Sequence, residues 1–132
     1  MGFVGGQNLF ARSDPREGFD FAKGDPITLY SYISGNQITT VTMYTVPVGK
    51  KLILHHMYLQ LWTVDGGVSS LQVQNESSEA VLILDYTATL NDNWVKYAAA
   101  IVPGGHTIKH VYNNGASGIS CYTVLGMLID NE

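Results

Sequence analysis

From residue 26 onward, the sequence is a succession of short segments rich in Ile, Val, Thr and Tyr, separated by clusters of Gly, Pro, Asn, Asp and Ser. Such segments are typical of β-strands, because branched and aromatic side chains pack well on a pleated surface and the intervening residues favour turns. No convincing amphipathic helix is present. We therefore predict strands at residues 27–34, 38–46, 52–63, 68–75, 80–86, 106–113 and 119–129, with residues 94–101 ambiguous.

About eight strands at short spacing predict an all-β fold, a single antiparallel β-sandwich. Eight antiparallel strands favour a jelly roll, but the count alone leaves an immunoglobulin-like sandwich open. Asp65-Gly66-Gly67 predicts a hairpin after the strand at 52–63. Val46-Pro47-Val48-Gly49 and Val102-Pro103-Gly104-Gly105 each precede a strand, and both predict tight bends.

Residues 1–25 differ from the rest, which divides the chain into an extended N-terminal arm (1–25) and a β-sandwich domain (26–132). The arm has no regular apolar period, although it holds all four phenylalanines of the chain. They are Phe3, Phe10, Phe19 and Phe21. Two interpretations remain open: the rings cover the outside of their own domain, or the arm docks on a neighbouring subunit.

Composition excludes several classes of protein. The 132 residues fit one domain, and 14% are charged, against about 25% in typical globular domains. A net charge of −4 with seven basic residues argues against a nucleic-acid-binding face. Cys121 is the only cysteine, so no intrachain disulfide can form, and its strand-like surroundings predict a buried thiol. Without a signal-peptide pattern or an apolar stretch of about 18 residues, we expect no membrane contact and folding in a reducing cytoplasm.

The histidines do not predict a metal site. His55 and His56 are adjacent on a strand, so their side chains are expected to point to opposite faces. His106 and His110 share a face, but four strand residues separate them by about 13 Å. A cupin motif fails as well, because Met57 stands at the second ligand position after His55. We therefore predict no bound metal and no cofactor.

No catalytic motif is present. The chain has neither a Gly-x-Ser-x-Gly elbow nor a phosphate-binding P-loop, and nothing around Cys121 resembles a nucleophile motif. Among the carboxylates that stand outside the arm, only Asp85 is expected to be partly buried, since most of the others fall in turns. The chain is not expected to be an enzyme.

The strand at 52–63 carries large apolar groups on both faces when it is read with a strict two-residue alternation. Ile53, His55, Met57, Leu59 and Leu61 then lie on one face, and Leu52, Leu54, His56, Tyr58, Gln60 and Trp62 on the other. In a sheet with one solvent-exposed face, apolar and polar residues should alternate along each strand. Either a loop or the arm covers the second face, or another subunit buries it, with Tyr58 and Trp62 as anchors. The predicted subunit interface comprises Phe3, Phe10, Phe19, Phe21, His56, Tyr58 and Trp62.

Three runs resemble segments of small β-sandwich structural proteins from the particles of tailed bacteriophages. They are the run from Tyr44 to Leu54, the run from Val102 to Ile108 and the closing run from Val124 to Ile129. The resemblance implies a non-enzymatic virion component, such as a capsid decoration protein or a head, neck or tail accessory subunit. It also implies symmetric homo-oligomers that dock on a larger viral capsid or tail protein, assembled in the host cytoplasm.

A second hypothesis is a carbohydrate- or receptor-binding module on a similar sandwich. Trp94 and Tyr97, with Asn91 and Asp92 beside them, are candidates for an aromatic glycan platform with a polar rim.

Overall fold

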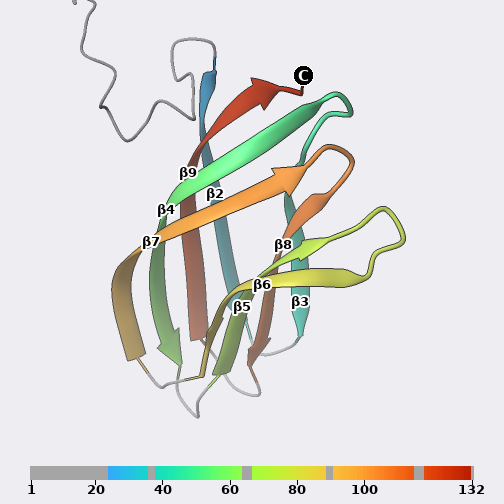
Figure 1. Cartoon of the computed structure of the whole chain (residues 1–132). Helices are drawn as coiled ribbons and strands as arrows, with labels where there is room; N and C mark the ends of the chain where they lie inside the picture. Colours follow the sequence, from blue (N-terminus) through green and yellow to red (C-terminus); the bar gives the residue numbers. More distant parts are fainter. Residues whose placement is uncertain (1–23, 36–37, 64–66, 89–90, 115–117, 132) are drawn as a thin grey trace, which may run out of the picture.

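The computed structural model describes residues 24–35, 38–63, 67–88, 91–114 and 118–131. These residues form eight β-strands, and the prediction of an all-β sandwich is confirmed (Figure 1). The strands are β2 (Asp25–Gly35), β3 (Thr39–Thr45), β4 (Lys50–Thr63), β5 (Gly67–Gln74), β6 (Ala80–Thr87), β7 (Asn91–Pro103), β8 (Thr107–Asn114) and β9 (Gly118–Asp130). The ambiguous segment at 94–101 is thus strand. Within the described residues there is no helix long and apolar enough to cross a membrane.

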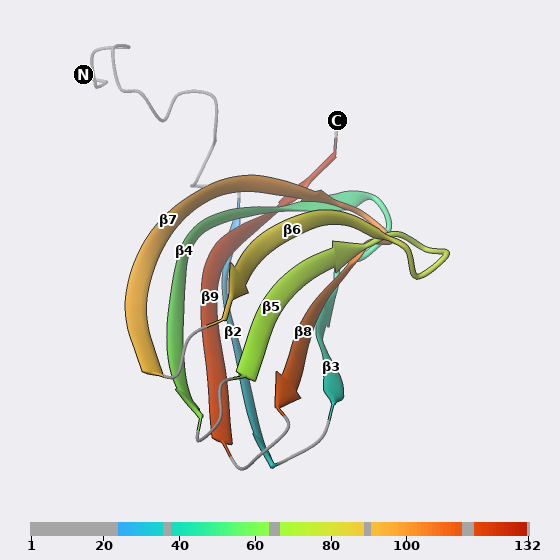
Figure 2. The same cartoon turned by 90° about the horizontal axis from the view of Figure 1, so that it is seen from below.

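The strands form two four-stranded antiparallel sheets, in the orders β2-β9-β4-β7 and β3-β8-β5-β6. The strands pair as β2–β9, β3–β8, β4–β7 and β5–β6, so that along the chain each pair is enclosed by the one before it. Figure 2 shows both sheets curving around the same interior. This nested pairing is the topology of a jelly roll, which decides the question that strand count left open.

Consecutive strands mostly belong to different sheets. In the described part of the chain, β5 and β6 are the one consecutive pair joined by hydrogen bonds. The hairpin predicted at Asp65-Gly66-Gly67 is therefore wrong, because β4 and β5 lie in opposite sheets. A local turn signal places a bend in the chain, but the sheet that the next strand joins depends on distant partners.

The two predicted bends are confirmed and are nearly identical. Lys50 N donates to Pro47 O (3.1 Å), and His106 N donates to Pro103 O (3.2 Å). Their glycines, Gly49 and Gly105, have φ of 88° and 84°, a conformation in which a side chain would be strained. Proline occupies the first position of each turn, where the sequence suggested the second.

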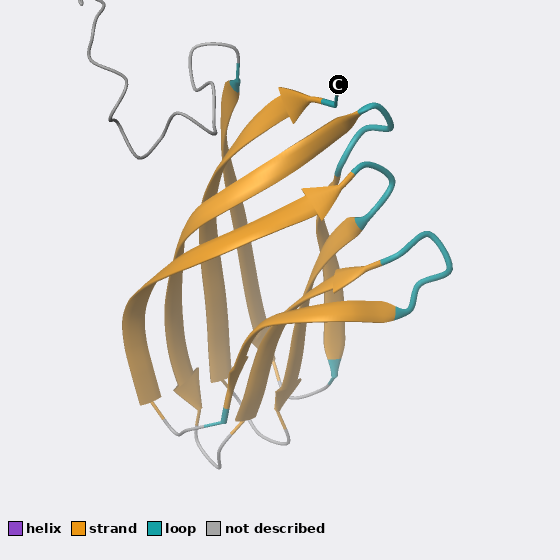
Figure 3. Ribbon diagram, viewed as in Figure 1, coloured by secondary structure: helices purple, strands orange, loops and turns teal. Residues whose placement is uncertain are grey.

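These two turns also pack against each other, where the chain crosses between the sheets. A Cβ at Gly104 would lie 2.8 Å from the carbonyl oxygen of Pro47. Gly105 N donates to Val46 O (2.8 Å), and Val46 N donates to His106 O (2.9 Å). Together with the β5–β6 turn they project from the same end of the sandwich (Figure 3).

The core lies between the sheets and is made of alternate residues from each strand. Its largest fully buried side chains include Tyr112, Tyr122, Leu52, Leu54, Met57, Leu61, Leu71 and Ile108. The burial of each such side chain stabilises the fold by roughly 1.5–3 kcal/mol, and no disulfide contributes.

The buried face of β4 changes half-way along the strand. Leu52 and Leu54 are buried at the start, whereas Met57, Leu59 and Leu61 are buried further on. All five belong to one continuous core. The sequence-based assignment of alternate residues of β4 to two unbroken faces is therefore wrong. The residues that point into the core change from even to odd positions, because β4 contains a one-residue irregularity.

That irregularity is a β-bulge at His55. Against β9, Leu54 pairs with Gly126 and His56 pairs with Leu125, so His55 is an extra residue in β4. A bulge of this kind rotates the following side chains by one position, because the side-chain period of a strand is two. Polar Gln60 and aromatic Tyr58 and Trp62 thus face outward.

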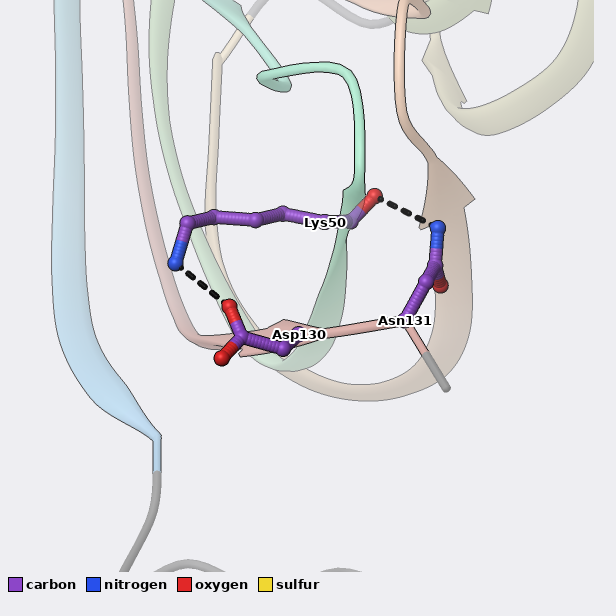
Figure 4. A network of polar contacts seen from close by, with 3 residues as sticks. All are labelled: Lys50, Asp130 and Asn131. Carbon is purple, nitrogen blue, oxygen red and sulfur yellow. Dashed lines mark hydrogen bonds and ion pairs between the residues drawn. The ribbon is translucent and has the colours of Figure 1, made fainter.

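An ion pair and a hydrogen bond connect the end of β9 to the start of β4 (Figure 4). Lys50 Nζ donates to Asp130 Oδ1 at 2.7 Å, and Asn131 Nδ2 donates to the carbonyl oxygen of Lys50 at 3.4 Å. The carboxylate of Asp130 raises the pKa of Lys50. Because the ion pair is exposed to solvent, it adds little to stability.

Candidate interaction surface

The solvent-facing side of the β2-β9-β4-β7 sheet, called the outer face from here on, carries a cluster of exposed large apolar side chains. The cluster consists of Tyr30, Tyr32, Tyr58, Trp62, Val95 and Ile101, each at least 40% exposed. They come from β2, β4 and β7 and become neighbours only through the sheet order. In register, Tyr58 stands opposite Val95 on one side and Thr123 on the other, and Thr123 stands opposite Tyr30.

The outer face includes a groove of about 480 Å³. Its lining combines aromatic rings, amides and a hydroxyl: Tyr30, Tyr58, Leu59, Gln60, Asn93, Trp94, Val95, Cys121 and Thr123. None of these side chains is charged at neutral pH. An exposed apolar surface free of charge is typical of a protein contact site or a site for a neutral ligand.

Three of the predicted interface residues lie on the outer-facing side of β4. Tyr58 is 40% and Trp62 49% exposed, and His56 is half-buried next to the bulge. The other four, Phe3, Phe10, Phe19 and Phe21, lie outside the described residues. The sequence did not single out Tyr30 and Tyr32, which the β2–β9 pairing brings onto the same face. The alternation of β2 carries a signal for them, since its apolar partners Leu29 and Ile33 are buried.

Of the four residues of the proposed glycan platform, Trp94 is the one whose side chain the structure describes. Trp94 is half-buried, packs against the core and donates its Nε1–H to Thr87 Oγ1 at 3.4 Å. Its ring meets Tyr122 edge-on, with centroids 6.3 Å apart. Trp94 therefore turns mainly inward. Asn91, Asp92 and Tyr97 belong to β7, and their side chains lie outside the described part of the structure.

The second sheet has an apolar edge. Strand β6 ends the order β3-β8-β5-β6, and its consecutive residues Val81, Leu82 and Ile83 are 53%, 43% and 50% exposed. Its register against β5 shifts twice. Such irregularities interrupt the even row of backbone donors and acceptors that a further strand would need.

A buried polar network joins the two sheets in the interior, and it begins at Asp85. Asp85 is 4% exposed, which confirms the expectation that it is buried. Its Oδ2 accepts hydrogen bonds from Tyr122 Oη (2.6 Å) and Thr87 Oγ1 (2.8 Å). Burial and this bond to Asp85 raise the pKa of Tyr122.

In the rest of the network, His110 contacts two buried serines. Its Nδ1 lies 2.7 Å from Ser31 Oγ and its Nε2 lies 2.8 Å from Ser120 Oγ. Ser120 in turn bonds Ser69 at 2.5 Å, across the sandwich. His110 is fully buried, and burial lowers its pKa to about 4. This network is sealed from solvent and connects the sheets; it offers no surface to a substrate.

Cys121 is buried, as the sequence predicted. Tyr30 Oη points at its sulfur from 3.9 Å, and burial raises the pKa of the thiol. A thiol with a raised pKa is a poor nucleophile. Among the described residues, no group of three or more His, Cys, Asp or Glu side chains is arranged to hold a metal ion.

Comparisons with known proteins detect a shared fold. No family model and no curated protein matches the chain. The crystal structure of the T13 particle of IBDV matches at a TM-score of 0.53 with 12% identity, over 82% of this chain and 31% of that one. The Gt strain of infectious bursal disease virus matches at 0.50 with 12% identity, over 82% and 32%. The capsid asymmetric unit of cyanophage Pam1 gives 0.47 with 17% identity, over 93% and 94%.

The chain spans about a third of the length of the bursal disease virus proteins that it matches. At 12% identity these matches establish the fold alone. The architecture is therefore one that viral particle proteins also use.

Proposed function

We propose that this protein is a non-enzymatic structural component of a virion, a capsid decoration protein or a head, neck or tail accessory subunit. The observation that carries the proposal is the outer face, where two tyrosines of β2 and Tyr58 and Trp62 of β4 are exposed together. The jelly-roll fold shared with proteins of viral particles supports it.

The protein associates with copies of itself through the outer face. Aromatic side chains are enriched in interfaces because they bury a large area at a small cost in conformational entropy. Burial of apolar surface contributes about 25 cal/mol per Å², and the uncharged lining of the groove avoids the penalty for desolvating ions. The N-terminal arm with its four phenylalanines then docks on the larger viral assembly.

The mass of the full chain in solution tests self-association. Sedimentation velocity should show a defined oligomer, and Tyr58→Lys combined with Trp62→Lys should shift it to the monomer. Thr40→Lys, at an exposed position of β3 in the other sheet, is the control and should leave the oligomer intact. A monomeric wild-type chain, or an oligomer insensitive to the Tyr58 and Trp62 substitutions, contradicts the proposal.

The groove favours a second candidate function, a carbohydrate- or receptor-binding module. Two tyrosine rings beside the amides of Gln60 and Asn93 suit a neutral sugar, which stacks on aromatic faces and pairs its hydroxyls with amides. A glycan array separates the two functions. Binding abolished by Gln60→Ala would favour the module, and an array without binding would remove it.

A further inference from the structure

The bulge in β4 brings two imidazoles together. His55 and His56 are consecutive, and in a regular strand their rings would point to opposite faces. In the structure His55 Nδ1 lies 2.6 Å from His56 Nδ1, and the rings meet edge-to-face with centroids 4.9 Å apart. The expectation that these two side chains point to opposite faces is therefore wrong, because it assumed an unbroken strand.

The two nitrogens that meet are both potential metal ligands. At this short distance one Nδ1–H donates to the other Nδ1, so both ring nitrogens face the same small space between the rings. Burial and the neighbouring His56 lower the pKa of His55, which favours its neutral imidazole, the form that binds metals. Both side chains are half-buried and thus keep some contact with solvent.

The spacing is close to that of a two-histidine chelate. Metal–nitrogen bonds of about 2.0–2.1 Å at angles of about 90–109° place two ligand nitrogens roughly 2.9–3.4 Å apart. From 2.6 Å the two nitrogens must move apart by about 0.3–0.8 Å, and each ring must turn so that both lone pairs meet at the ion. The proton held between the rings moves to Nε2 of the same imidazole, so the change is one of tautomer and leaves both rings neutral.

We propose that His55 and His56 form a binding site for a divalent first-row transition-metal ion, held by the two Nδ1 atoms, with water in the remaining positions. Imidazole ligands suit Cu²⁺, Ni²⁺ and Zn²⁺, and Cu²⁺ binds tightest in the general order of affinities. The site does not depend on the virion role, although His56 also lies on the outer-facing side of β4 with Tyr58 and Trp62.

Titration calorimetry of the full chain with CuCl₂, NiCl₂ and ZnCl₂ at pH 7.5 tests the site. We expect one ion per chain, with Cu²⁺ bound most tightly, and at least a tenfold loss of affinity in both His55→Gln and His56→Gln. His106→Gln is the matched control and should bind like the wild type.

The wild-type chain also provides a readout that needs no variant. In NMR spectra, Zn²⁺ should shift the ring resonances of His55 and His56 and leave those of His110 in place. Absence of a bound ion overturns the proposal. Binding that persists in both His55→Gln and His56→Gln, or that His106→Gln removes, overturns it too.

Discussion

Asp85 is an acidic side chain in the interior of the sandwich, and the two hydroxyl groups that donate to its Oδ2 govern its effect on stability. Tyr122 and Thr87 donate to the same Oδ2 atom. In Asp85→Ala both hydroxyls lose this acceptor, and each unsatisfied buried group costs about 1–3 kcal/mol. We expect Asp85→Ala to lower the free energy of unfolding by about 2 kcal/mol or more, measured by urea denaturation.

Asp85→Asn serves as the matched control, since it keeps one acceptor oxygen at nearly the same volume. Its loss of stability should be smaller than that of Asp85→Ala. Equal losses in the two variants would show that the hydroxyl contacts contribute nothing beyond packing.

His110 makes the stability of the fold depend on pH. Its pKa is about 4 in the folded protein, against an ordinary value of 6.5 for histidine. Below pH 6.5 the unfolded chain takes up a proton that the folded chain cannot, so stability is fully present above pH 6.5 and is lost as the pH falls towards 4. The shift corresponds to about 3 kcal/mol across this window.

Urea unfolding of the wild type and His110→Gln between pH 7.5 and 4.5 measures this contribution. Glutamine can still hydrogen-bond the serines but does not titrate. The free energy of unfolding of the variant should therefore change less with pH than that of the wild type, by the contribution of one proton. Parallel curves for the two proteins would be incompatible with a buried neutral histidine.

Among the elements, β4 shows most clearly what a sequence can and cannot predict. Its position was predictable because branched and aromatic residues are concentrated between turn residues. The same holds for the other strands except β7, whose segment 94–101 the sequence left ambiguous. The bulge was missed, although the sequence carries its signal. Leu52 and Leu54 are out of phase with Met57, Leu59 and Leu61, and the phase changes at His55-His56. A two-residue pattern that changes phase predicts an inserted residue.

The sheet that each strand joins could not be predicted from the sequence, for a different reason. Turn residues report local chain reversal, whereas the pairing of β4 with β7 and β9 involves residues some 30 to 80 positions away. For the same reason, the full set of residues on the outer face could not be predicted. Tyr58 and Trp62 could be singled out within one strand, but Tyr30 and Tyr32 join them only through the order of the sheet.

The phase of β4 leads to a prediction about single-residue deletions. Deleting His55 should be tolerated, because Leu54 and Met57 then become separated by one residue and all five apolar side chains still point inward. Deleting Gln60 should unfold the protein, because Leu61 then turns outward, and each leucine removed from a core costs about 2–5 kcal/mol. Circular dichroism and thermal melting of the two variants check this. If both deletions melt alike, β4 has no bulge at His55.

At the scale of the whole molecule, the arm and the outer face are placed side by side along the chain. The described body begins at Gly24, directly before β2, and β2 is an edge strand of the sheet that carries the outer face. Tyr30 and Tyr32 lie five and seven residues beyond Asp25 on that strand. The chain therefore joins its four phenylalanines to the edge of its most apolar surface.

This connection predicts that arm and face act in the same assembly while the body folds without the arm. A chain lacking residues 1–23 should keep the far-ultraviolet signature of a β-protein, since the pairings that define the two sheets lie between residues 25 and 130. Sedimentation should show weaker association than in the full chain, because four aromatic rings are lost. Replacing the four phenylalanines with serine should reproduce the loss, whereas Arg12→Gln with Arg16→Gln, which keeps the rings, should not. If the truncated and full-length chains associate equally well, the arm has no part in self-association, and its role is confined to the contact with the larger viral assembly.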